Sequence, residues 1–341
     1  MSDQSMYLYG VLLLCASSFL VGHNGTQEGI GDISREEELE LEKQLELLNK
    51  PAMRPTSLPR RVKDQVSPKF AEPVTRGLQG GGCPIGTVPI RRITKEDLIR
   101  ERLRSKIKSF EDNSQGTHYA VLRTTANSNK KFVGAGAQIS THNPHVDGRQ
   151  YSAARVKIRN GPDSLEAGWR VDPTLYGDNR PRHFIRTDAG GSHCFNTRCP
   201  GFIIVRSDIR LDEVVDKDRA NGNWWFVAGS NHDEVGFWPK KIFTGLGGLA
   251  NYAEWGGEAF SPLGTNPAPM GTGLVPVKIP GFNAYFCEVS VLNEYGQTVD
   301  VDNTEEFADD HKLYGVKDLG IGDSGRFVQY GGPRHVILKN Y

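Results

Sequence analysis

The sequence has no excess of either charge, because 41 Lys and Arg residues balance 41 Asp and Glu residues. A protein that binds nucleic acid usually carries a basic excess, so we expect no nucleic-acid partner. Long apolar runs are also scarce. Only residues 6–22 form one, and this run is short for a bilayer span. We therefore expect no stable membrane partner.

Residues 6–22 (MYLYGVLLLCASSFLVG) have the length of a signal-peptide core and end in small residues, which favours cleavage near Gly22. The preceding residues include Asp3 and no Lys or Arg. That flank is unusual for a signal peptide and leaves an uncleaved anchor as the alternative. We predict a signal peptide over residues 1–22 and a secreted protein.

Cysteine is scarce as well: there are five, and Cys15 lies within the predicted signal. The other four permit three pairings. Cys194 and Cys199 are close enough in sequence to close a small loop in an oxidising compartment, and we predict that they form a disulfide. Zinc would require a second such pair or His at ligand spacing, so we expect no metal. The spacing does not pair Cys83 or Cys287.

Several motifs of catalysis and cofactor binding are missing or incomplete. No Walker loop is present, and residues 134–136 (GAG) lack the third Gly and following helix of a dinucleotide site, so we expect no cofactor. Residues 322–325 (GDSG) resemble the nucleophile motif of trypsin-like proteases, but the His context that must accompany Ser324 is absent. We interpret this motif as a turn. His142 and His145 lack a third ligand and are interpreted as a solvated loop.

Two amphipathic helices are expected in the first third of the chain. Ser34 and Glu37 form the pattern of a capping box, and Leu residues then recur on one helical face. Thr94 and Asp97 repeat the pattern at a second helix. Residues 51–82 are rich in Pro, Gly and basic residues, which is typical of a linker.

From His118 onwards, short β-prone runs alternate with turn residues, and no long amphipathic helix follows Lys108. Asn221 and Gly222 favour a hairpin. Many short strands at this spacing are typical of a sandwich or a barrel, so the chain is predicted to be all-β after a helical N-terminal region. The expected runs are 118–125, 131–139, 151–158, 166–171, 202–205, 224–227, 235–238, 275–279 and 285–292.

Two carboxylates stand among small and aromatic residues. Glu166 lies in LEAGW (165–169), and Glu258 lies in EWGGEAF (254–260). Desolvation in such surroundings is expected to raise a carboxyl pKa, and a pair of carboxylates drives the two values apart. One carboxylate could then take a proton from water while the other, protonated, polarises a carbonyl. Solvated strand edges are the simpler interpretation of both residues.

The same segments resemble the plant neprosin family, glutamic peptidases that cleave at proline. The resemblance extends over about four-fifths of the chain and is most specific between residues 166 and 182. The segments are CPIGTVPIRR (83–92), HYAV (118–121), LEAGWRVDPTLYGDNRPR (165–182), CFNTRCPGF (194–202), GNWWF (222–226), VGFWP (235–239), WGGE (255–258) and QYGGP (329–333).

The resemblance implies an antiparallel double-sheet β-sandwich, an activation peptide over residues 30–110 and a peptidase domain over 115–341. It assigns catalysis to Glu166 and Glu258, and it matches the small-loop disulfide. It also implies a latent precursor, extracellular or vacuolar residence, and two partners: a Pro-rich peptide substrate and the chain's own activation peptide. The aromatic residues of the same segments are candidates for substrate binding: Trp169, Tyr176 and Trp255.

The chain also departs from the family pattern. A Cys-containing piece of the activation peptide is missing after Lys50-Pro51, residues 211–221 are short by about one strand, and Arg186 replaces an aromatic residue. A missing strand could open the edge of the sandwich. The alternative function is therefore an inactive module that binds cell-wall protein or carbohydrate in a Trp-lined groove, although the five Trp also suit a core. A glycosidase is a third option, because it too uses two carboxylates.

Overall fold

The computed structural model describes residues 34–49, 93–100, 116–125, 130–196, 201–204, 213–217, 222–228, 233–277 and 282–333, with residues 213–217 described by their backbone alone. The predicted signal peptide and linker lie outside these ranges. Within them, no helix is long and apolar enough to cross a bilayer.

Both predicted capping boxes are present. Helix α1 (Arg35–Leu48) begins after Ser34, whose hydroxyl accepts a hydrogen bond of 3.2 Å from the Glu37 amide while Glu37 accepts one of 3.1 Å from the Ser34 amide. Residues 95–100 are also helical, and Thr94 and Asp97 exchange the same pair of bonds at 3.2 and 3.0 Å. The helices are confirmed locally, whereas their role as an activation peptide stays a prediction.

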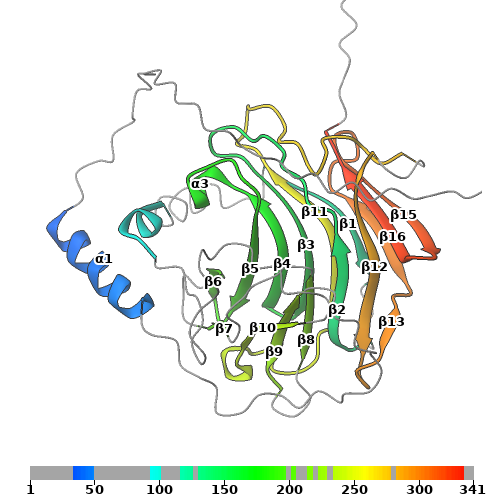
Figure 1. Ribbon diagram of the computed structural model, residues 1–341, viewed down its shortest axis with the longest axis horizontal. Helices are drawn as coiled ribbons and strands as arrows, with labels where there is room; N and C mark the ends of the chain where they lie inside the picture. Colours follow the sequence, from blue (N-terminus) through cyan, green and yellow to red (C-terminus); the bar gives the residue numbers. More distant parts are fainter. Residues whose placement is uncertain are drawn as a thin grey trace, which may run out of the picture. The chain divides into compact units, whose positions relative to one another are not determined.

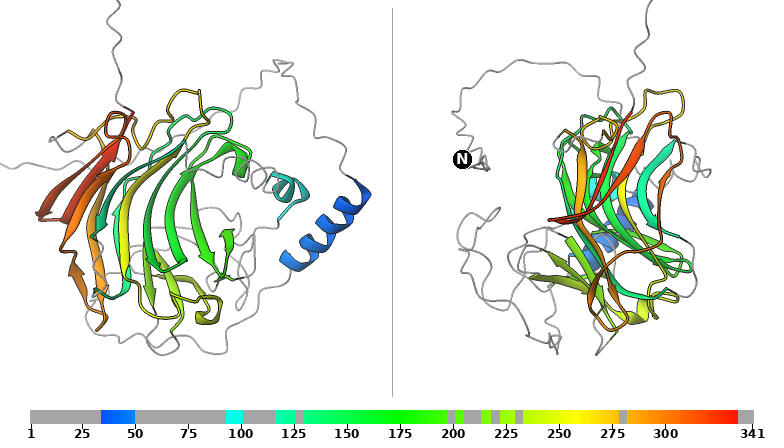
Figure 2. Two further views of the ribbon diagram at one scale, coloured as in Figure 1. Left: turned by 180° about the vertical axis from the view of Figure 1, so that it is seen from behind. Right: turned by 90° about the vertical axis from the view of Figure 1, so that its right-hand side faces the viewer.

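The remaining described residues form two antiparallel sheets that lie face to face (Figures 1 and 2). The seven-stranded sheet runs in the order β14 (Thr304–Ala308), β1 (Thr117–Thr124), β11 (Tyr252–Phe260), β3 (Tyr151–Asn160), β4 (Asp163–Val171), β5 (Arg182–Ala189) and β6 (Ser192–Phe195). Strands far apart in sequence therefore become neighbours, and β11 lies between β1 and β3.

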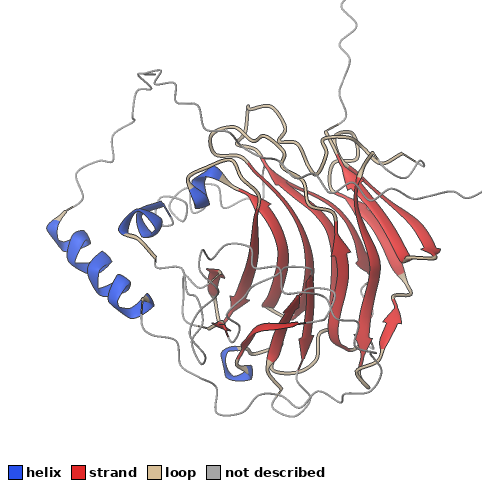
Figure 3. Ribbon diagram, in the orientation of Figure 1, coloured by secondary structure: helices blue, strands red, loops and turns tan. Residues whose placement is uncertain are grey.

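The second sheet has nine strands among the described residues. Its order is β15 (Gly315–Gly322), β16 (Gly325–Gly331), β12 (Ala284–Asn293), β2 (Phe132–Ile139), β8 (Glu213–Lys217), β9 (Trp224–Ala228), β10 (Asp233–Trp238) and β7 (Ile203–Ile204), with β13 (Thr298–Asp300) beside β12. Besides the helical segments above, only α3 (Pro173–Tyr176) and the 3-10 turn η1 (Lys240–Ile242) interrupt the strands in the described part (Figure 3). The predicted antiparallel double-sheet sandwich is confirmed.

The core lies between the sheets and contains four of the five Trp, each at most 1% exposed: Trp169, Trp224, Trp238 and Trp255. Trp225, 4% exposed, packs with Val227 and Phe237 in a separate cluster. Side chains alternate across a strand, so on β4 and β11 the odd-numbered residues face this core. Trp169 donates its indole N–H to the Ser140 carbonyl at 2.9 Å, and Trp255 donates to the Gly136 carbonyl at 3.1 Å. The interpretation of the Trp residues as core packing is confirmed, and the Trp-lined groove is wrong.

Three local expectations about strands have different outcomes. The segment 211–221, which looks short, still forms β8, and β8 lies between β2 and β9 rather than at an edge. The predicted hairpin is present, because β8 pairs antiparallel with β9 up to Lys217 and Trp224, whereas Asn221 lies outside the described residues. The predicted strand at 275–279 is wrong for its described part, because residues 275–277 are irregular.

Candidate active site

The open face of the seven-stranded sheet, opposite the core, carries the even-numbered residues of β4 and β11. Arg155 on β3 lies near the centre of this face and is opposite Gly168 on β4 and Gly256 on β11. Neither glycine has a side chain, so the Arg155 side chain has room between the three strands. The positions two residues from these glycines carry Glu166 and Glu258, within diagonal reach of the guanidinium.

Close packing at Gly168 is required by the strands themselves. A Cβ at this position would lie 1.8 Å from the Ala154 carbonyl oxygen, so Gly168→Ala forces β3 and β4 apart. We expect this substitution to lower the free energy of unfolding by roughly 1–3 kcal/mol, measured by urea denaturation. Gly322→Ala is the control, because nothing lies within 4 Å of its Cβ. Equal stability of the two variants would contradict the packing argument.

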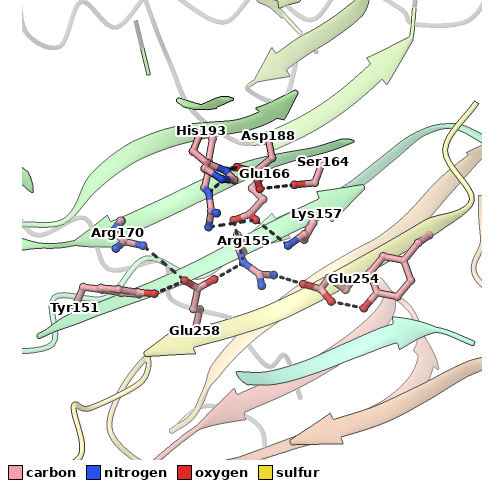
Figure 4. A network of polar contacts seen from close by, with 12 residues as sticks. Tyr151, Arg155, Lys157, Ser164, Glu166, Arg170, Asp188, His193, Glu254 and Glu258 are labelled. Carbon is pink, nitrogen blue, oxygen red and sulfur yellow. Dashed lines mark hydrogen bonds and ion pairs between the residues drawn. The ribbon is translucent and has the colours of Figure 1, made fainter. Parts of the chain in front are cut away.

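One guanidinium binds three carboxylates (Figure 4). Nε of Arg155 lies 2.8 Å from Oε2 of Glu258 and 3.2 Å from Oε2 of Glu166. Its Nη1 lies 2.7 Å from Oε1 of a third carboxylate, Glu254. The two predicted catalytic glutamates therefore converge, and the same nitrogen atom lies within ion-pair distance of both.

Further polar groups bind Glu258 on its other oxygen. The Tyr151 hydroxyl donates to Oε1 at 2.6 Å, and Nη1 of Arg170 lies 3.8 Å from the same atom. Arg170 is held by Asp172 at 2.8 Å and stacks 3.4 Å above the Tyr151 ring. Asp172 also caps α3 by accepting the Leu175 N–H, so this short helix fixes the position of Arg170.

Glu166 has its own cations. Nζ of Lys157 lies 2.9 Å from Oε1, and Nη1 of Arg186 lies 3.8 Å from it. The register explains both contacts, because Lys157 on β3 and Arg186 on β5 are the residues directly opposite Glu166. Arg186, the residue that departs from the family pattern, therefore belongs to the site.

Both glutamates are deeply buried, with Glu166 at 1% and Glu258 at 3% exposure. Burial raises a carboxyl pKa, but the cations outweigh it here. Lys157, Arg155 and Arg186 lower the pKa of Glu166 from 4.5 to about 2. Arg155 and the other guanidinium groups, with the Tyr151 hydroxyl, hold the pKa of Glu258 lower still. The predicted rise in pKa is wrong, and both carboxylates are ionised at neutral pH.

The three predicted substrate-binding residues are not equivalent. Trp169 and Trp255 are three residues from Glu166 and Glu258 along their strands, so they point to the opposite face and pack in the core. Neither reaches the carboxylates, and this prediction is wrong for both. Tyr176 on α3 packs with Phe184 and other residues of a small apolar cluster that includes Ala153, on the face that carries Arg155. Tyr176 therefore lies on the same face as the two glutamates, and its role in substrate binding stays a prediction.

The motifs set aside from the sequence have ordinary structural roles. Ser324 lies in the two-residue turn between Gly322, the last residue of β15, and Gly325, the first residue of β16, which pair with each other. His142 contacts the Ser140 hydroxyl at 2.9 Å, and His145 is exposed beside Asp147. In the described residues, no group of three His, Cys, Asp or Glu is placed to bind a metal.

Of the four cysteines that follow the predicted signal, the structure describes Cys194 and Cys287. Cys194 lies on β6, whereas Cys199 and Cys83 lie outside the described residues. The pairing of Cys194 with Cys199 therefore stays a prediction. Cys287 on β12 has a free thiol, and burial raises its pKa.

A model of the Neprosin family matches residues 148–333, more than half of the chain, and the match contains β4, β11 and both glutamates. The chain belongs to the Neprosin family. Membership of the Neprosin family supports a peptidase.

Two solved structures of scytalido-glutamic peptidase also align with the chain. The complex with a peptide-based transition-state analogue is 15% identical, covers 64% of this chain and 98% of the peptidase, and has a TM-score of 0.34. A second complex, with a transition-state analogue inhibitor, is 14% identical, covers 63% and 97%, and has a TM-score of 0.31. Values this low identify no residue role in this Neprosin-family member.

The sequence motifs predict the two glutamates but not the groups that bind them, Tyr151, Arg155, Lys157 and Arg170. They also miss Glu254, which shares Arg155 with the two glutamates. A signal was present on β3, where Arg155 and Lys157 alternate with apolar residues in a run that is otherwise buried. Charged residues at every second position of such a strand indicate a polar face. The sequence alone does not say which carboxylates face it.

Proposed function

We propose that this protein is a secreted glutamic peptidase, made as a latent precursor, which hydrolyses peptide bonds at proline with Glu166 and Glu258 acting on a water molecule. One observation carries the proposal: two buried glutamates from separate strands of a Neprosin-family chain converge on the open face of one sheet. Extracellular or vacuolar residence and proline specificity are supported by the family resemblance.

The low pKa values of the two glutamates predict that hydrolysis is fastest at strongly acidic pH. One glutamate must be protonated to act as acid, and the other ionised to act as base. With a pKa of about 2, Glu166 is protonated in roughly one molecule in ten at pH 3. Protonation also weakens the ion pair of Glu166 with Arg155. The proposed activity therefore rises about tenfold for each pH unit between about 5 and 3.

Latency follows a steric argument. A segment that covers the open face excludes substrate, and protonation of its carboxylates can weaken its hold. The first turn of α1 contains Glu36, Glu37 and Glu38, which suits release in acid. Incubation at pH 3 should convert the full-length chain to a shorter active form, followed by intact mass and N-terminal sequencing. An N-terminal segment that stays uncleaved while the domain remains folded would count against the pH switch.

The test of the chemistry is hydrolysis of a fluorogenic Pro-containing peptide from about pH 2.5 to pH 7. Glu258→Gln and Glu166→Gln should each lower kcat by at least about 100-fold, because each removes a proton-transfer group. Glu294→Gln is the matched control, since this carboxylate is exposed in the turn after β12. Retained activity in either Gln variant at Glu166 or Glu258 would refute the two-glutamate mechanism.

A second function has one observation in its favour. Arg155 lies between the two glutamates and keeps both ionised, as in a structural ion-pair network. We propose as the alternative an inactive module that uses the same open face to bind cell-wall protein or carbohydrate. A folded, processed wild type that cleaves no peptide at any pH would favour this function over the peptidase.

A further inference from the structure

A pocket of about 340 Å³ opens on the same face beside the glutamates. It is lined by residues of β1, β3, β11 and β14, and Arg155 and Glu254 belong both to the pocket and to the ion-pair cluster. Val121 and Phe307 supply an apolar wall. Tyr119 lies directly opposite Glu258 in the register of β1 with β11, so the pocket adjoins the proposed position of the reacting bond.

The carboxylates that line this pocket are already engaged. Glu254 accepts from the Tyr252 hydroxyl and forms the 2.7 Å ion pair with Arg155. Asp309 accepts the Tyr119 backbone N–H at 2.5 Å and contacts Nδ1 of His118 at 2.8 Å. Their negative charge is therefore largely compensated inside the molecule.

The hydrogen-bond donors that line the pocket have fewer partners within the part of the protein that the structure describes. Nε of Arg123 donates to Glu305 at 2.7 Å, and its guanidinium lies 3.7 Å from the centre of the Phe307 ring. The terminal N–H groups of Arg123 have no hydrogen-bond partner among the described residues, and neither does the Tyr119 hydroxyl. The charge of Glu258, with burial, raises the pKa of Tyr119, so this hydroxyl remains a donor.

A guanidinium edge and a phenol beside an apolar wall match a carboxylate carried on a short aliphatic stem. Glu305, the partner of Arg123, is 48% exposed and forms a weak surface pair that leaves the guanidinium charge accessible. We propose that this pocket is a substrate subsite for a carboxylate of the peptide, with Arg123 as the specificity-determining residue and the Tyr119 hydroxyl as a second donor. The proposal rests on the proposed peptide substrate.

The carboxylate can come from an acidic side chain or from the C-terminus of the peptide. The test uses labelled Pro-containing peptides with Glu or Gln near the proline, each as a C-terminal acid and as an amide. Binding is measured by fluorescence anisotropy at pH 6, and kcat/KM is measured for every peptide that is cleaved. Wild type should favour one carboxylate source by about tenfold or more, as expected for a charge-assisted hydrogen bond.

Arg123→Gln should remove this preference, measured as the ratio between the charged and the neutral peptide within each variant, while Arg123→Lys should keep part of it. Arg159→Gln is the matched control, because Arg159 lies on the same face of β3 but stacks on Tyr252, 4.5 Å from the ring centre, away from the pocket. Loss of the preference in Arg159→Gln to the same degree, or no preference in a wild type that binds the peptides and is not stabilised by glutarate as described below, would overturn the proposal.

A further experiment tests carboxylate binding in the pocket independently of peptide cleavage. Glutarate, a dicarboxylate without a peptide bond, is compared with glutaramide at matched ionic strength by thermal unfolding. Stabilisation of wild type by glutarate, lost in Arg123→Gln, supports the pocket even if no peptide is bound or cut, in which case only the proposed function fails. Absence of this stabilisation, together with no charge preference among peptides, refutes the subsite.

Discussion

Arg155→Met should lower the free energy of unfolding at pH 7 by roughly 3–5 kcal/mol, the typical cost of removing one partner from a buried ion pair. Arg155 is 1% exposed and binds Glu166, Glu254 and Glu258. Methionine fills much of the same volume but leaves three carboxylates without their shared cation. Urea denaturation measures the loss.

Two variants separate the ion pairs from packing. Arg159→Met makes the same change on the same face of β3 at an exposed position, and it should cost less than about 1 kcal/mol. Arg155→Lys keeps the charge but cannot reach three carboxylates from one planar group, so its stability should fall between the two. An Arg155→Met protein as stable as wild type would show that the carboxylates find other partners.

The alternation of side chains along a strand predicts more about the site than the motifs around the two glutamates do. A spacing of three residues in a strand places Trp169 and Glu166 on opposite faces, and the same holds for Trp255 and Glu258. The sequence therefore predicts that these Trp cannot line a groove with the glutamates. The prediction that Trp169 and Trp255 bind substrate was wrong because it grouped residues by proximity in the chain, and because the Gly-rich strand β11 was not predicted as a strand.

The electrostatics of the site could not be predicted in the same way. Whether burial raises a carboxyl pKa depends on which cations lie opposite it, and that depends on strand register. Arg155 reaches Glu258 only because β3 pairs with β11, about a hundred residues further along the chain. Arg186 reaches Glu166 through the β4–β5 register. The local motifs around each glutamate contain neither fact.

Lowering the pH from about 5 to 2 should remove several kcal/mol of stability from the folded domain. The folded-state pKa of Glu166 is depressed to about 2 from 4.5, so its ionised form stabilises the folded state above pH 4.5. This contribution is lost as the pH falls through about 2. A depression of this size corresponds to roughly 3 kcal/mol, and Glu258 acts in the same direction.

Glu166→Gln isolates the contribution of one group. The variant should be less stable than wild type at pH 7, because Lys157 and Arg186 lose their shared carboxylate. The difference should shrink as the pH falls from 5 towards 2, where wild-type Glu166 becomes neutral as well. Denaturation at about pH 2.5, 4, 5.5 and 7 measures it, with Glu294→Gln as the exposed control. A difference that does not change with pH would show that Glu166 is not held as an ion pair.

Protonation of Glu166 would then affect both the activity and the stability of the protein. A proton on Glu166 creates the acid that hydrolysis requires, and it also breaks ion pairs with Arg155 and Lys157 that hold β3 to β4. The proposed peptidase should therefore be most active close to the pH at which it begins to unfold. If wild type unfolds at a higher pH than the one at which hydrolysis appears, the ion-pair network is structural, and the binding module becomes the better account of this face.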